Sequence, residues 1–145
     1  MKSLRIKLAA ISFGLTCTVV LAGCSGNSAN VAACNKANTK LKESRISVSE
    51  ISSQNDQILG LSRLAAIFSV LSTDLSNLAD SSSGDVRDEL NSSAIAAHNV
   101  ADAVTALDQN TISVEMSKLK RIFADNGSLD KACQSVGASP FSTGW

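Results

Sequence analysis

The apolar positions of this chain recur at intervals of three and four residues, which is the period of a packed α-helix. The clearest series lies in the middle of the chain and consists of Leu61, Leu64, Phe68, Leu71, Leu75 and Leu78. A more polar series precedes it from about Val31 and consists of Cys34, Ala37, Leu41, Ser44, Val48 and Ile51. Both series predict amphipathic helices, and Asn55, Asp56 and Gly60 predict an interruption between them.

A third helix is expected to run from Val86 to about Leu107. The serine-rich break before it ends at Gly84, and either Ser83 or Asp85 is suited to cap its first turn. Its inward positions are mostly small, so a neighbouring helix can approach closely; they comprise Leu90, Ala94, Ala97, Ala101 and Val104.

A fourth helix is expected after the turn at Asp108–Asn110, beginning at Thr111 or Ser113. Gly127 is suited to end it with a left-handed cap. A short helical turn from Leu129 to Val136 follows. The apolar positions of the fourth helix are Ile112, Met116, Leu119 and Phe123.

No window shows the alternation of β-branched and aromatic residues that is typical of strands. We therefore predict an all-α, up-and-down four-helix bundle with a short C-terminal helical turn, and helices of about 20 to 25 residues. The bundle is expected to occupy residues 31–137. The remaining tail, 138–145, carries the single tryptophan, Trp145, which either packs back on the bundle or stays free to contact a partner.

The N-terminal segment has a different character. Lys2, Arg5 and Lys7 precede an apolar run over 8–21, which has the charge pattern and length of a signal peptide. The run is too short and too rich in serine and threonine for a membrane-spanning helix. Residues 1–23 are therefore predicted to be a signal peptide.

The sequence Leu21-Ala22-Gly23-Cys24 follows this apolar run and resembles the lipobox of bacterial lipoprotein precursors. The resemblance implies cleavage between Gly23 and Cys24 and attachment of lipid to the Cys24 thiol. It also implies an anchor in the cell membrane on its extracytoplasmic face, or in an outer membrane if the cell has one. The alternative is an ordinary cleaved signal peptide with an incidental cysteine.

Four cysteines then reduce to one pair, because Cys17 leaves with the signal peptide and Cys24 carries the lipid. Cys34 and Cys133 remain in an oxidising compartment, where a disulfide between them is the natural inference. Such a bond would tie the two ends of the bundle together. Two separate buried thiols are the alternative, and a zinc site is disfavoured because only one histidine accompanies the pair.

Removal of the leader also changes the charge balance. The full chain has 13 basic and 13 acidic residues, and the leader carries three of the basic ones. The mature chain is therefore mildly acidic, which argues against a nucleic-acid partner.

The sequence contains no set of residues that indicates catalysis, a cofactor or a metal. His98 and Asp102 are spaced to touch on one helix face, but a surface pair explains them without any chemistry. The acidic cluster Asp85, Asp88 and Glu89 suits a helix N-terminus, and the segment 125–130 only faintly suggests a calcium loop. We predict that the protein is not an enzyme.

A short polar segment, 24–30, is expected to be a flexible tether. Because so few residues separate Cys24 from Cys34, the disulfide end of the bundle should face the membrane and the opposite turns should point outward. We therefore expect a lipid-anchored interaction or structural module of the cell envelope with an envelope protein partner. The alternatives are a binder of small apolar ligands and a prophage-type superinfection-exclusion lipoprotein.

Overall fold

The computed structural model describes the backbone of residues 21–52, 57–124 and 126–141, and side chains within 27–51, 60–124 and 126–141. All regular elements in these ranges are helical, which confirms the all-α prediction. The order along the chain is α1 (Leu21–Ser52), α2 (Gln57–Asp80), α3 (Gly84–Thr105), α4 (Gln109–Phe123) and α5 (Ser128–Ser135).

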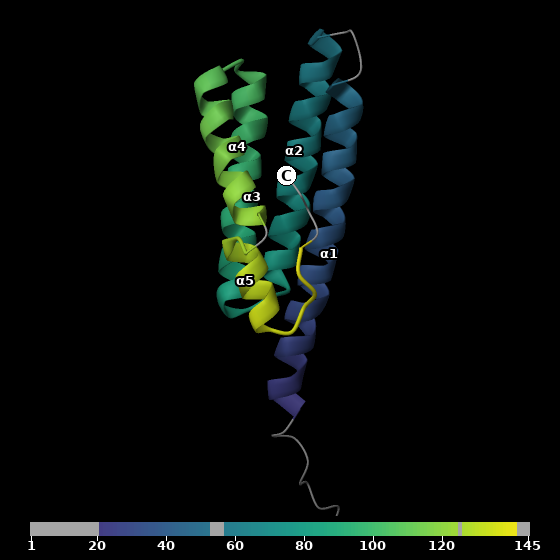
Figure 1. Cartoon of the computed structure of the whole chain (residues 1–145), viewed down its shortest axis with the longest axis vertical. Coiled ribbons are helices and arrows are strands. Elements are labelled where there is room, and N and C mark those ends of the chain that lie inside the picture. The colour runs from purple at the N-terminus through teal and green to yellow at the C-terminus, as the bar shows by residue number, and fades with distance from the viewer. Residues whose placement is uncertain (1–20, 53–56, 125, 142–145) are drawn as a thin grey trace, which may run out of the picture.

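The four long helices run alternately up and down, as predicted, and α5 folds beneath α4 (Figure 1). Helices α2 and α3 form the most extensive contact, and α1 and α4 flank them as the outer members of two hairpins. The short α5 contacts α1, α3 and α4 and so joins the two hairpins at one end. We call this the clasped end, and we call the opposite end, where α1 ends and α4 begins, the distal end.

The predicted apolar stripes form the core. Each helix contributes residues that are almost completely shielded from solvent, so the periodicity correctly identified the inward faces. The largest fully buried side chains are Phe68, Phe123, Leu41, Leu71, Leu75, Leu90, Leu119, Leu129, Val86, Val100 and Val104.

The first helix begins earlier than expected. Residues 24–30 were predicted to be a flexible tether, but α1 is continuous from Leu21 through this segment to Ser52. Adding a residue to an existing helix fixes one residue for each hydrogen bond gained, so a helix held by tertiary packing can extend through a polar sequence. The backbone of this segment is therefore helical in the structure rather than irregular. The predicted interruption falls partly at 53–56, outside the described residues.

The fourth helix has 15 residues and begins at Gln109, before the expected start at Thr111 or Ser113. Its N-cap is Asp108, whose side chain accepts hydrogen bonds from the backbone N–H groups of Asn110 and Thr111, both at 3.1 Å. The sequence prediction placed Asp108 in a turn. Its role as a cap follows only when the helix is known to start at the next residue. Four polar residues at 108–111 offered several equivalent starting points.

Gly127 does not form the left-handed cap that was predicted. It has φ −63°, whereas its neighbour Asn126 has φ 60°. A Cβ atom on Gly127 would lie 2.3 Å from the carbonyl oxygen of Ile122. This glycine is required because the chain passes very close to the end of α4 as it enters α5.

Candidate functional site

A disulfide joins the two ends of the bundle sequence. Cys34 on α1 and Cys133 on α5 are bonded, with their Cα atoms 5.7 Å apart, and both are buried in the core. The predicted pairing is confirmed. The bond connects the first helix to the last, so the long N-terminal helix is covalently tied to the rest of the bundle.

A second contact holds α1 at the same end. The side chain of Asn30 is buried and lies against the loop between α2 and α3. Its oxygen accepts a hydrogen bond from the backbone N–H of Ser83 at 2.9 Å, and its Nδ2 donates to the Ser83 carbonyl at 3.3 Å. This contact, made within the predicted tether, anchors the helical turn that precedes Cys34.

Asp130 organises the C-terminal part of the clasped end. It is buried, and its carboxylate accepts hydrogen bonds from the backbone N–H groups of Asn126 at 2.9 Å and Phe141 at 2.8 Å. The Gln134 side chain donates a third at 2.6 Å. These donors use both carboxylate oxygens, so the arrangement gives no support to the faint calcium-loop pattern. Sequence reasoning did not identify this role because two of the donors are backbone groups brought close only by the fold.

The C-terminal segment packs against the bundle as far as Phe141, which is buried. Part of the predicted tail therefore belongs to the folded domain. Trp145 lies outside the described residues, so neither alternative for it is decided.

The predicted lipidation site lies at the start of α1. The backbone at Gly23 and Cys24 is helical, whereas their side chains and residues 1–20 are outside what the structure describes. Among the described helices, none combines the length and apolar character needed to cross a bilayer.

His98 and Asp102 lie on the exposed surface of α3. The imidazole Nε2 is 3.4 Å from a carboxylate oxygen of Asp102, and both side chains are more than 60 % exposed. The expected surface pair is present. The described part of the chain places no third chemical group with it.

The acidic cluster at the start of α3 does not converge on one point. Asp85 lies in the exposed first turn, Asp88 pairs with Arg87 at 3.5 Å, and Glu89 accepts a hydrogen bond from Ser128 at 2.6 Å. No group of metal-binding side chains occurs within the described ranges.

Within the described residues, α1 and α4 do not contact each other. Helix α2 does not pack against α4 there either. Toward the distal end the inward stripes of these three helices become only half-buried. We call this set of side chains the distal apolar face; it consists of Val48, Leu61, Leu64, Ile112 and Met116.

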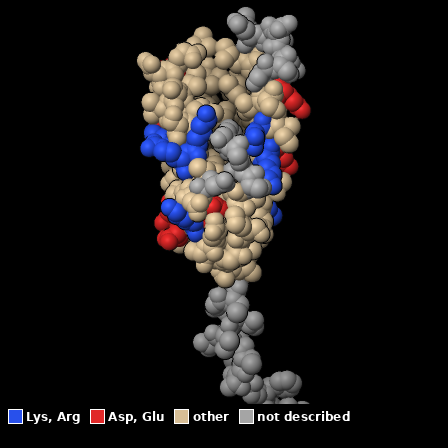
Figure 2. Space-filling view, in the orientation of Figure 1, with Lys and Arg blue, Asp and Glu red and all other residues tan. Residues whose placement is uncertain are grey.

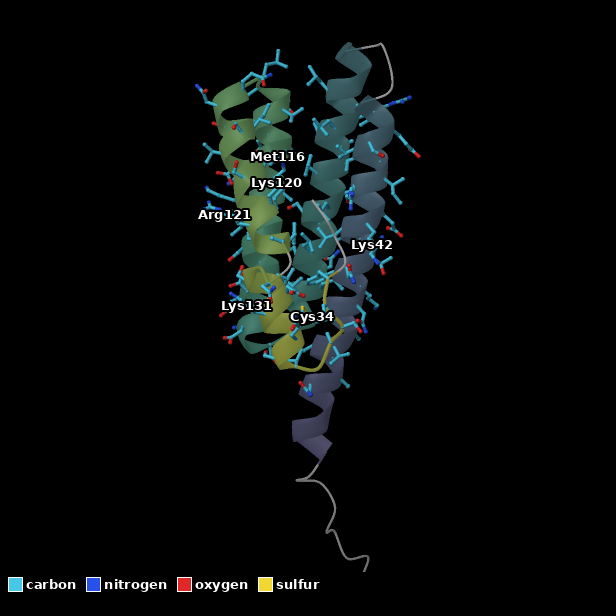
Figure 3. All side chains as sticks on the ribbon, in the orientation of Figure 1. Cys34, Lys42, Met116, Lys120, Arg121 and Lys131 are labelled. Carbon is cyan, nitrogen blue, oxygen red and sulfur yellow. A yellow bond between two sulfur atoms is a disulfide. The ribbon has the colours of Figure 1, made fainter. Side chains whose placement is uncertain are left out.

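Basic side chains lie on α1 and α4 nearer the clasped end than this face. Figure 2 shows lysine and arginine side chains over both helices. In Figure 3, Met116 and Lys120 lie on α4, and Lys42 lies on α1. Met116 and Lys120 are four residues apart, which places them on the same face of α4.

Most acidic groups of α1 and α4 are already engaged elsewhere. Lys40 lies 3.3 Å from both Glu43 and Asp74. Hydrogen bonds to Asp74 and then Glu43 raise the pKa of this lysine. Lys118 pairs with Glu115, the one acidic residue of α4. By contrast, within the described residues no ion pair involves Lys42, Lys120, Arg121 or Lys131.

The structure thus contains two notable regions: a covalently clasped end near the predicted lipidation site, and a distal end where the apolar stripes of α1, α2 and α4 are only half-buried. Comparison of the chain with protein-family models, curated proteins and solved structures finds no match.

Proposed function

We propose that this protein is a lipid-anchored, non-catalytic module of the bacterial cell envelope that presents a helical bundle to a protein partner. The lipobox-like sequence ending at Cys24 carries this proposal. The helical backbone of α1 adds a geometric argument, because it runs unbroken from that cysteine into the domain.

The length of helix between the proposed anchor and the clasp is short. Cys34 follows Cys24 by ten residues, which corresponds to about 15 Å along a helix axis. A lipid on Cys24 would hold the clasped end close to the bilayer. The disulfide and the Asn30–Ser83 contact would then keep the bundle from pivoting freely about its own first helix.

The absence of catalysis stays a prediction. It is supported by the exposed positions of His98 and Asp102, because a catalytic base normally needs a neighbouring group and a site that excludes water. A small apolar ligand is less favoured, since the small inward residues of α3, among them Ala94, Ala97 and Ala101, are buried in the helix-to-helix contacts of the bundle. The superinfection-exclusion alternative stays a prediction as well.

The anchor can be tested with a matched pair of cysteine variants. Cells producing the wild-type chain, Cys24→Ser and Cys17→Ser are fractionated, and the intact mass of each product is measured. We expect the wild type and Cys17→Ser to be membrane-bound, cut before Cys24 and heavier by a diacylglyceryl group. Cys24→Ser should lack the lipid mass and the normal cleavage. A wild-type product cut at the same place but released without lipid would refute the anchor.

A further inference from the structure

We infer that a groove between α3 and α4 binds the carboxyl terminus of a partner protein whose last residue is apolar. The groove has a volume of about 550 Å³ and is lined by side chains of both helices and by Ser128 at the start of α5. This inference deepens the proposed function and rests on it for the existence of a protein partner.

The two helices supply apolar contacts within the groove. Ala96 on α3 is buried, Ile122 on α4 is half-buried, and Ile95 on α3 is 62 % exposed. An apolar side chain laid in the groove would cover Ile95 without disturbing the core beneath it. Because burial of apolar surface favours binding, this part of the groove selects an apolar residue.

A buried carboxylate at the groove lacks one hydrogen-bond partner. The Glu115 side chain is only 8 % exposed, and its Oε1 accepts a hydrogen bond from the ammonium group of Lys118. Its Oε2 is shielded from solvent and has no partner among the described residues. A buried acceptor without a donor is unfavourable, so a ligand that brings an N–H group to Glu115 gains from satisfying it.

Lys118 controls access to this oxygen. Because Oε2 of Glu115 is out of contact with solvent, a donor reaches it only after a side chain moves. The Lys118 side chain is suited to move, since it is 45 % exposed and has a long flexible stem. Its ammonium group can turn from Glu115 to a ligand carboxylate while an N–H group of the ligand takes its place.

Arg121 provides a second cation for that carboxylate. It lines the same groove, is exposed, and forms no ion pair with the described acidic residues. In Figure 3 it lies on the side of α4 away from α1. A guanidinium group binds a carboxylate through two parallel hydrogen bonds. The charged residues that line the groove are Glu115, Lys118 and Arg121, so one added carboxylate balances their charge.

The order of these charges matches the end of a peptide. Glu115, Lys118 and Arg121 follow one another at intervals of three residues, or about 4.5 Å along the helix axis. The nitrogen and the carboxylate carbon of a terminal residue are about 2.5 Å apart. The N–H group can therefore face Glu115 while the carboxylate lies between the two cations. Capture of a terminal carboxylate is a known mode of peptide recognition.

The shape of the groove favours a peptide over a free amino acid. An open groove between two helices would cover a single amino acid only in part, whereas small-ligand sites usually bury most of the ligand. A longer chain gains contacts from the residues that precede its last one. Helix α5 folds beneath α4 (Figure 1), and its first residue, Ser128, borders the groove, which suits a chain that enters from the distal end and ends there.

The test measures peptide binding to the full-length protein, purified in a non-ionic detergent. An array of peptides with random last four positions, each made as a free acid and as a carboxamide, is probed with the protein. A binder is then synthesised for fluorescence anisotropy. We expect binders to end in an apolar residue with a free carboxylate. The carboxamide should bind at least about tenfold more weakly, and raising the ionic strength should weaken binding of the free acid.

Two matched pairs of variants locate the binding surface. Arg121→Gln and Ile95→Ser should each lower the affinity at least about fivefold, because each removes a contact with the terminal residue. The controls Arg87→Gln and Val70→Ser make similar changes at exposed positions outside the groove and should bind like the wild type. All four positions are exposed, so the fold should be kept, which circular dichroism checks.

Changes in the peptide identify the contacting groups. The losses from the carboxamide and from Arg121→Gln should not add, because both remove the same contact. Methylation of the last peptide nitrogen and Glu115→Ala should likewise show no added loss. Circular dichroism checks that Glu115→Ala is folded, and the Arg121 comparison tests the inference independently because Arg121 is exposed. Additive losses in both comparisons would refute the assignment.

Several results would overturn the inference. These are no peptide binding up to about 1 mM, binders without preference for a free carboxylate, or equal binding by all variants. Full displacement of the peptide by free leucine at the same concentration would assign the groove to an amino acid instead. Cys24→Ser should keep its peptide affinity, so failure of the anchor and failure of the groove are distinguishable.

Discussion

Two residues at the ends of α4 show how single positions determine the local backbone. Asp108 starts the helix by accepting hydrogen bonds from the free N–H groups of its first turn. Gly127 allows the chain to leave the other end at a separation that a side chain would prevent. Both positions act on the backbone around them, so their importance cannot be judged from the hydrophobic pattern.

Gly127→Ala should destabilise the protein by about 2 to 3 kcal/mol, because the added methyl group meets three backbone carbonyl oxygens. Urea unfolding followed by circular dichroism measures the change. Gly84→Ala is the control: Gly84 has φ 57° but open space around it, so only the left-handed conformation opposes alanine, at about 1 kcal/mol. Equal effects of the two substitutions would contradict the close approach at Gly127.

Asp108 should make the free energy of unfolding depend on pH in the acidic range. Hydrogen bonds from the hydroxyl and then the backbone N–H of Thr111 lower the pKa of Asp108 in the folded protein. Its contribution is therefore present above the pKa of the unfolded chain, about 4, and is lost as pH falls through the lower folded value. The difference in thermal midpoint between the wild type and Asp108→Ala should be larger at pH 6 than at pH 2.5. A difference independent of pH would contradict this cap.

At the scale of the helices, the main correction concerns the beginning of α1. The polar segment before Cys34 is helical because a single buried side chain, Asn30, fits the loop at Ser83, and because the disulfide fixes the next turn. The polarity of the sequence predicted a flexible tether. It could not reveal a partner 53 residues away.

Asn30→Ala should loosen the first turns of α1 without unfolding the bundle. It leaves the Ser83 N–H without its acceptor, which costs about 1 to 2 kcal/mol. Hydrogen exchange should accelerate in residues 27–33 and around Ser83, while the amides of α3 stay protected. Asn35→Ala, at an exposed position of the same helix, should leave the exchange pattern unchanged. Unaltered protection in Asn30→Ala would show that the contact does not hold the helix.

For the whole molecule, the disulfide is the strongest single constraint, since it links residues 99 apart in sequence. Chain-entropy arguments assign such a closure about 4 to 5 kcal/mol. The double variant Cys34→Ser with Cys133→Ser should therefore have a free energy of unfolding that is lower by about 4 to 5 kcal/mol. Reductant should shift the unfolding of the wild type toward that of the double variant and leave the variant unaffected. A wild type insensitive to complete reduction would contradict this assignment.

The sequence by itself determined the number of long helices, their inward faces and the choice of the cysteine pair, because these depend on periodicity and on a short count of thiols. The tertiary structure decided which polar residues hold the clasped end together: Asn30 and Asp130 accept hydrogen bonds from backbone groups that only the folded chain brings to them. It also decided that α1 and α4 stay apart. Four amphipathic helices are compatible with either a closed or an open bundle, and the choice depends on how α5 and the two hairpins pack. Periodicity along one helix does not contain that information.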